Sequence, residues 1–107
     1  MKILFICNQG KNRSATAAEI FKDRYKTDFA GIYNKLSNEG VLEWADIIIV
    51  MEEHQRAEIG KKYPEQYLKK KILCLDIPDV YGYMQPELVK LLEEKMKRLK
   101  LWTNKKN

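Results

Sequence analysis

The chain has 107 residues, of which 45% are hydrophobic and 33% charged, and its formal net charge at pH 7 is +5. This composition is typical of a soluble globular protein, and the length suits a single domain over residues 1–107 with one hydrophobic core. The apolar runs are too short to span a membrane and the N-terminus lacks the regions of a signal peptide, so we expect neither a membrane protein nor a secreted one.

The first third of the chain predicts two strands with a helix between them. Residues 2–7 are mostly apolar, as in a buried parallel strand, and residues 28–33 predict a weaker second strand. Thr16 and Glu19 are spaced like a capping box in the intervening helix. That helix is marked by apolar residues at helical spacing, namely Ala17, Ile20, Phe21 and Tyr25.

The rest of the chain continues the alternation. The next predicted elements are a short helix over 37–44, a strand over 47–51, a polar helix over 52–62 and a strand over 71–75. Tyr63-Pro64 ends the polar helix, and Pro86 lies near the first turn of a final helix. The apolar stripe of that final helix consists of Leu88, Leu91, Leu92, Met96 and Leu99. Residues 102–107 predict a frayed basic tail.

This order of elements predicts an α/β fold, a three-layer, doubly wound, four-stranded parallel sheet with right-handed crossovers. Ligands of such sheets bind beyond the carboxyl ends of the strands. The loops that follow the strands at 2–7 and 71–75 both leave this edge. We therefore expect the two loops to share one site.

The loop after the first strand carries the most specific pattern in the chain. It runs from Cys7 to the start of a helix through Asn8, Gln9, Gly10, Lys11, Asn12, Arg13 and Ser14. A tight loop at a helix N-terminus points backbone N–H groups into a concavity that suits a dianionic phosphate. Arg13 can bind such a group through two parallel hydrogen bonds, with Cys7 beneath the phosphorus as nucleophile. The pattern predicts cleavage of a phosphate ester through a cysteinyl-phosphate.

Two further residues of the loop fit this interpretation. Gly10 lies where the backbone needs positive φ or close approach to a ligand, and the Ser14 hydroxyl can donate to a thiolate or cap the first turn. Taken singly, Cys7 would be a small buried hydrophobic residue and Arg13 a solvated charge. The spacing and the strand–loop–helix context favour the site.

With this loop, the chain resembles the low-molecular-weight protein tyrosine phosphatases, whose Cys-(x)5-Arg-Ser loop follows an apolar strand. Residues 14–19 are similar to the family's RSPTAE segment, with Ala15 where proline is usual. The resemblance continues in three segments, Ala30-Gly31, residues 44–51 and residues 77–81, which are similar to the family's SAG, ADLILVM and PDPY segments. It covers most of the chain, roughly residues 2–101.

The resemblance implies a tyrosine phosphatase that needs no metal or other cofactor, with Asp79 as the general acid. Asp76 in the same loop is the competing candidate, and it could instead tether the loop. Tyr81 and Tyr83 are candidates to wall the pocket and stack on a phosphotyrosine ring, or to pack on the core.

The chain departs from the family in three further places. Asn12 replaces the second cysteine of the loop found in many members, so a disulfide between loop neighbours cannot form. Gly10 stands where asparagine is common, and the segment between Tyr33 and Trp44 is much shorter than usual. Such a chain resembles a minimal prokaryotic branch of the family, and the departures bear on substrate class more than on chemistry.

Two other functions share parts of this pattern. A thiol-based arsenate reductase has the fold and loop but needs further redox cysteines, and Cys74 in a predicted strand does not supply a relay. A phosphoanion- or phosphopeptide-binding module would keep the loop without turnover.

The expected partners are a phosphotyrosine protein or a small phosphomonoester, with phosphate- or sulfate-type anions in the loop. We expect neither nucleic acid nor membrane, because the lysine clusters lack interleaved aromatic residues and suit solvated helix faces. His54 is the only histidine, which argues against a metal cluster. Two cysteines far apart, one of them needed as a thiolate, indicate the reducing cytoplasm.

Overall fold

A computed structural model describes residues 1–33 and 39–101 of the chain. The elements in chain order are β1 (Lys2–Cys7), α1 (Arg13–Ile20), β2 (Lys26–Gly31), α2 (Glu39–Trp44), β3 (Ile47–Val50), α3 (Glu53–Lys62), α4 (Pro64–Lys69), β4 (Lys71–Cys74) and α5 (Pro86–Leu99). The strands form one parallel sheet in the order β2-β1-β3-β4, which places β1 and β3 in its centre. The predicted α/β class and four-stranded parallel sheet are confirmed.

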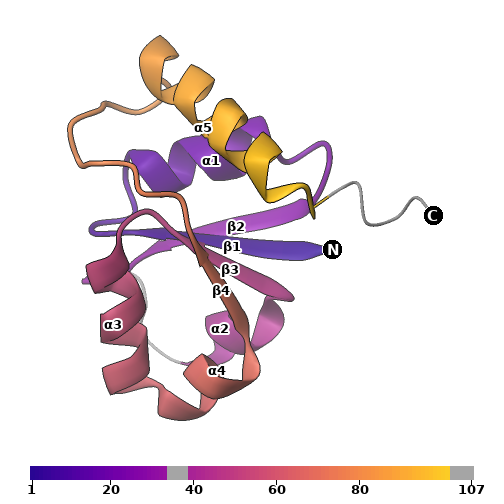
Figure 1. The fold of residues 1–107 in the computed structure, drawn as a ribbon, viewed down its shortest axis with the longest axis vertical. Helices are drawn as coiled ribbons and strands as arrows, with labels where there is room; N and C mark the ends of the chain where they lie inside the picture. Colours follow the sequence, from indigo (N-terminus) through magenta and orange to yellow (C-terminus); the bar gives the residue numbers. More distant parts are fainter. Residues whose placement is uncertain (34–38, 102–107) are drawn as a thin grey trace.

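Helices cover both faces of the sheet, with α1 and α5 on one face and α2, α3 and α4 on the other (Figure 1). Alternate residues of β1 divide between two cores: Ile3 and Phe5 belong to the core under α1 and α5, and Leu4 and Ile6 belong to the opposite core. Cys7 continues the first set. Its side chain therefore lies on the α1 face of the sheet, at the carboxyl end of a central strand.

The predicted capping box in the first helix is wrong. Helix α1 begins at Arg13, which places Thr16 in its buried interior, where the Thr16 hydroxyl accepts the Met84 N–H at 2.8 Å. Glu19 instead forms an ion pair with Lys22 at 2.8 Å. The N-cap residue of this helix is Asn12, which makes no side-chain cap hydrogen bond, so the helix starts before Thr16. Thr16 thereby joins α1 to the segment between β4 and α5.

Several element boundaries also differ from the prediction. The predicted polar helix is followed by a separate helix, α4, because Pro64 suits the first turn of a new helix. Strand β2 begins at Lys26 and ends at Gly31, two residues earlier at each end than predicted. Residues 37 and 38 of the predicted short helix and the predicted tail at 102–107 lie outside the described residues. Within 1–33 and 39–101, no helix is long and apolar enough to cross a membrane.

Candidate active site

The loops after β1, β3 and β4 meet around Cys7. Cys7 ends β1 and is only 3% exposed. Its Sγ accepts the Gly10 N–H at 3.3 Å and lies 3.1 Å from the Ser14 hydroxyl, so one backbone group and one side chain are placed to donate to sulfur. Gly10 makes its contact from the left-handed region, with φ of 69°, which favours glycine. The Cys7 thiol thus lies within hydrogen-bond distance of a loop N–H group and of the Ser14 hydroxyl.

Arg13 opens α1 and is 1% exposed. Its Nη1 donates to Glu52 Oε1 and to the carbonyl of Ile77, both at 2.7 Å. Nε and Nη2 have no hydrogen-bond acceptor among the described residues, although Nη2 lies 3.6 Å from Asp79 Oδ2. The guanidinium is therefore anchored to the protein through Nη1, while the N–H groups of Nε and Nη2 make no hydrogen bond to the described residues.

A small cavity of about 100 Å³ joins these groups. It is lined by Cys7, Gln9, Lys11, Asn12, Arg13 and Asp79. The sequence predicted each of these six as a site residue, and the fold brings together loop residues and an aspartate more than sixty positions away. Among the lining residues, Lys11 and Arg13 carry positive charge and Asp79 carries negative charge.

The Asn8 side chain contacts the start of α3 and does not line this cavity. Its side-chain oxygen accepts from Gln55 Nε2 at 3.0 Å and lies 2.6 Å from His54 Nε2. The His54 ring stacks on Tyr33 with 6.4 Å between ring centroids. Asn8 does not line the cavity, and its side chain joins the loop to the start of α3.

The two candidate acids occupy different positions. Asp79 lines the cavity and is about half exposed. Asp76 is exposed, has φ of 61°, and its carbonyl accepts from Lys95 Nζ at 3.2 Å. Asp76 does not line the cavity. Of the two candidates, Asp79 is therefore the one that lies beside Cys7 and Arg13.

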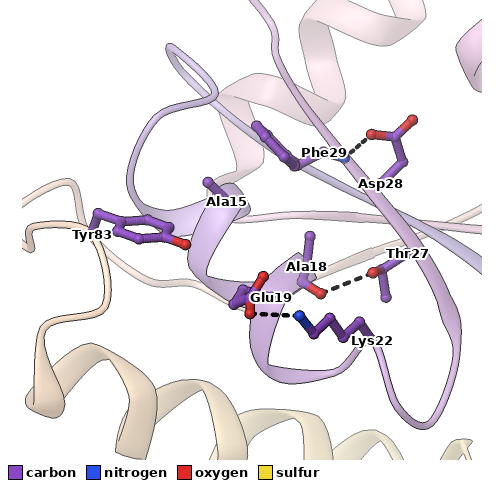
Figure 2. A pocket seen from close by; sticks show the side chains of 8 residues that line it. All are labelled: Ala15, Ala18, Glu19, Lys22, Thr27, Asp28, Phe29 and Tyr83. Atoms are coloured by element: carbon purple, nitrogen blue, oxygen red, sulfur yellow. Dashed lines mark hydrogen bonds and ion pairs between the residues drawn. The ribbon is translucent and has the colours of Figure 1, made fainter.

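The two tyrosines do not line the cavity. Tyr81 is half-buried and packs against the core under α1 and α5. Tyr83 borders a second, open cavity of about 500 Å³ between α1 and β2, and its other lining residues are Ala15, Ala18, Glu19, Lys22, Thr27, Asp28 and Phe29. Figure 2 shows this cavity, with the Tyr83 ring beside Ala15. Stacking of Tyr81 or Tyr83 on the ring of a substrate stays a prediction.

The sequence interpretation missed Glu52 and Gln55. Gln55 is fully buried, and its side-chain oxygen accepts the N–H groups of Met51 at 2.8 Å and Glu52 at 3.0 Å. Both residues follow β3, whose carboxyl end lies beside that of β1. Strand order was the signal that could have found them, because polar residues after adjacent parallel strands share one edge.

Cys74 has no connection with the site. It ends β4 and packs, partly buried, against the core on the α3 face, opposite to Cys7. Burial raises the pKa of the Cys74 thiol, and both cysteines are free. Among the described residues, no three His, Cys, Asp or Glu side chains are grouped so that they could hold a metal ion.

No family model and no curated protein sequence matches the chain, but solved structures do. A low-molecular-weight phosphotyrosine phosphatase from Vibrio cholerae O395 matches with a TM-score of 0.79 and 15% identity, over 100% of this chain and 99% of the other. The YwlE arginine phosphatase from Geobacillus stearothermophilus matches with a TM-score of 0.74 and 18% identity, over 99% and 97%. The tyrosine phosphatase Wzb from Escherichia coli K30, solved with phosphate, matches with a TM-score of 0.70 and 19% identity, over 99% and 98%. The chain therefore has the fold of the low-molecular-weight protein tyrosine phosphatases.

Proposed function

We propose that this protein is a cysteine-dependent phosphatase that hydrolyses phosphotyrosine or a related phosphomonoester. The observation that carries the proposal is the pairing of Cys7 with the Nε–Nη2 edge of Arg13 in one small cavity. Buried guanidinium donors without acceptors are costly, and a phosphate provides two oxygens at the spacing that the Nε–Nη2 edge matches. Loop N–H groups over residues 8–14 and the start of α1 add further anion binding.

The chemistry follows from these positions. The Cys7 thiolate attacks phosphorus, so that an S–P bond forms while the P–O bond to the leaving group breaks. Asp79 gives its proton to the leaving oxygen. Water then attacks the cysteinyl-phosphate, Asp79 takes a proton from it, and the S–P bond breaks to release inorganic phosphate. Arg13 stabilises the charge on the equatorial oxygens in both steps, and Ser14 stabilises the departing thiolate.

The polar residues around the thiol have lesser roles. Gln9, Lys11 and Asn12 line the cavity, where they contact the substrate near its phosphate, and Lys11 attracts anions. Asn8 and Gly10 contribute through the backbone, because the Asn8 side chain is held by α3 and Gly10 has none. The reaction needs a free thiolate, and we place the enzyme in the reducing cytoplasm.

The rival functions have less support. Cys74 lies on the opposite face of the sheet from Cys7, so it does not form the second half of an arsenate reductase relay. A binding module without turnover needs no acid, yet Asp79 lies in the same cavity as the nucleophile. The names of the solved structures, two tyrosine phosphatases and an arginine phosphatase, agree with the hydrolase.

The test is hydrolysis of p-nitrophenyl phosphate by the wild type and by Cys7→Ser. The wild type is expected to turn over the substrate, and the serine variant to lose turnover while still binding inorganic phosphate. Phosphate binding by both proteins without turnover would identify a binding module. Appreciable activity of Cys7→Ser would contradict the cysteinyl-phosphate mechanism.

A further inference from the structure

Glu52 makes the closest side-chain contact with Arg13. Glu52 Oε1 accepts from Arg13 Nη1 at 2.7 Å, and the two side chains are 29% and 1% exposed. The carboxylate contacts Nη1, which is not part of the Nε–Nη2 edge. Glu52 therefore occupies a different side of the guanidinium from the one that we assign to phosphate.

A guanidinium is planar, so anchoring one nitrogen from two directions fixes the plane as a whole. Nη1 is anchored in this way, by Glu52 and by the carbonyl of Ile77 at the start of the loop that contains Asp79. Without an anchor, a long arginine side chain has several rotamers, and ordering it costs conformational entropy. Because the two contacts already order the Arg13 side chain, this entropy is not lost again when substrate binds.

Glu52 itself is held by the start of α3, where it is the N-cap residue. The Gln55 side chain accepts the Glu52 N–H, and its amide nitrogen donates to Asn8 Oδ1. The loop after β1 is thus joined to the corner between β3 and α3 at both of its ends, through Asn8 at one and Arg13 at the other.

We propose that Glu52 is a positioning residue for phosphoryl transfer, which acts by holding Arg13 with its Nε–Nη2 edge toward the cavity. The proposal rests on the proposed phosphatase function and adds a residue to its machinery. It opposes a second reading, in which the carboxylate merely neutralises Arg13. In the positioning role, the length of the Glu52 side chain matters, because the carboxylate must contact Nη1. In the neutralising role, only its negative charge matters.

Two conservative variants of Glu52 separate the effect of its side-chain length from the effect of its charge. Glu52→Asp keeps the charge but withdraws the carboxylate by one methylene, and aspartate is a favoured N-cap residue, so α3 is preserved. Glu52→Gln keeps the reach and an acceptor oxygen but removes the charge. The matched control is Glu53→Gln, because Glu53 is exposed, pairs with Arg56 and makes no contact with the site. Thermal unfolding establishes that each variant is folded.

The measurements are kcat and KM for p-nitrophenyl phosphate and, by calorimetry, Kd for inorganic phosphate. For Glu52→Asp we expect kcat/KM to fall and the phosphate Kd to rise by roughly tenfold or more, as for loss of a hydrogen bond to a charged group. Glu52→Gln should lose less than Glu52→Asp in both quantities, and Glu53→Gln should match the wild type.

The opposite order, with Glu52→Gln the more affected or binding phosphate more tightly than the wild type, would overturn the positioning role in favour of neutralisation. Glu52→Asp equal to the wild type in both quantities would also overturn it. If Glu52→Asp fails to fold, tighter phosphate binding by Glu52→Gln still contradicts the proposal, and weaker binding supports it. A wild type that neither hydrolyses the ester nor binds phosphate would instead remove the proposed function itself.

Discussion

Gly10, in the middle of the loop after β1, packs backbone against backbone on Gly31 at the end of β2. A Cβ atom at Gly31 would lie 2.3 Å from the carbonyl carbon of Gln9, and one at Gly10 would lie 2.7 Å from the Gly31 nitrogen. Neither distance is sterically possible, and both opposing atoms are backbone, which cannot rotate away. The end of β2 therefore supports the middle of the loop through a contact that only glycine permits.

Replacing this support should disturb the site as well as the fold. We expect Gly31→Ala to lower the free energy of unfolding by about 1 to 3 kcal/mol, the usual cost of overpacking, and to weaken phosphate binding because the loop must shift. Urea unfolding and phosphate calorimetry measure the two effects. Gly82→Ala is the control, since a Cβ atom at Gly82 would meet Gln85 Oε1 at an ordinary contact distance of 3.9 Å. Unchanged phosphate affinity in Gly31→Ala would show that the loop does not depend on this contact.

The sequence predicted the loop residues of the site and Asp79, but not Glu52. Cys7, Gly10 and Arg13 lie in one short loop, and local spacing was enough to relate them. Glu52 was missed because its contact with Arg13 depends on the order of β1 and β3 in the sheet, which no local pattern encodes. The orientation of Tyr81 was likewise undetermined, because a tyrosine near a loop suits a pocket wall and a core position equally.

Arg13 offers a test of the guanidinium geometry. Arg13→Lys keeps the positive charge but loses the planar fork, so it cannot hold Glu52 and the Ile77 carbonyl while presenting two parallel donors to phosphate. We expect the phosphate Kd to rise by roughly 10- to 100-fold, and turnover of p-nitrophenyl phosphate to fall at least as much. Cys7→Ser in the same assay should keep its phosphate affinity. Equal phosphate binding by Arg13→Lys and the wild type would mean that charge alone attracts the anion.

The two cysteines should respond differently to oxidation and alkylation. Peroxide is expected to abolish the proposed phosphatase activity by oxidising Cys7, without forming a disulfide to Cys74. Strand β3 lies between β1 and β4, so the backbones of these two strands lie about 9 to 10 Å apart. The side chain of Cys7 lies in the core on one face of the sheet, and that of Cys74 packs against the core on the other face. A disulfide needs a Cα separation of about 4.4 to 6.8 Å.

Mass spectrometry of the peroxide-treated protein checks this expectation, and an intramolecular Cys7–Cys74 disulfide would contradict it. Burial raises the pKa of Cys74, which keeps its thiol protonated at neutral pH and slows its reaction with iodoacetamide. Alkylation at Cys74 should accelerate as the pH rises through that raised pKa. Inorganic phosphate should protect Cys7 and leave the rate at Cys74 unchanged.

The last prediction concerns the general acid and depends on the different placement of Asp79 and Asp76. Protonation of the leaving group matters most when that group is a poor one. We therefore expect Asp79→Asn to lower turnover of phosphotyrosine by roughly two to four orders of magnitude, and that of p-nitrophenyl phosphate much less. The acid-dependent limb of the pH profile should flatten, while substrate binding stays nearly intact, because Arg13 and the loop remain.

Asp76→Asn is the matched control, since it makes the same chemical change three residues earlier in the same loop. Asparagine tolerates the positive φ of this position, so the backbone is retained. We expect Asp76→Asn to lower turnover only slightly, and by a similar factor for both substrates, because Asp76 does not line the cavity. Its backbone carbonyl, which accepts from Lys95, is kept in the variant. If Asp76→Asn shows the leaving-group-dependent loss and Asp79→Asn does not, the two roles are exchanged. The 3.6 Å approach of Asp79 to Arg13 would then be an electrostatic contact without a part in proton transfer.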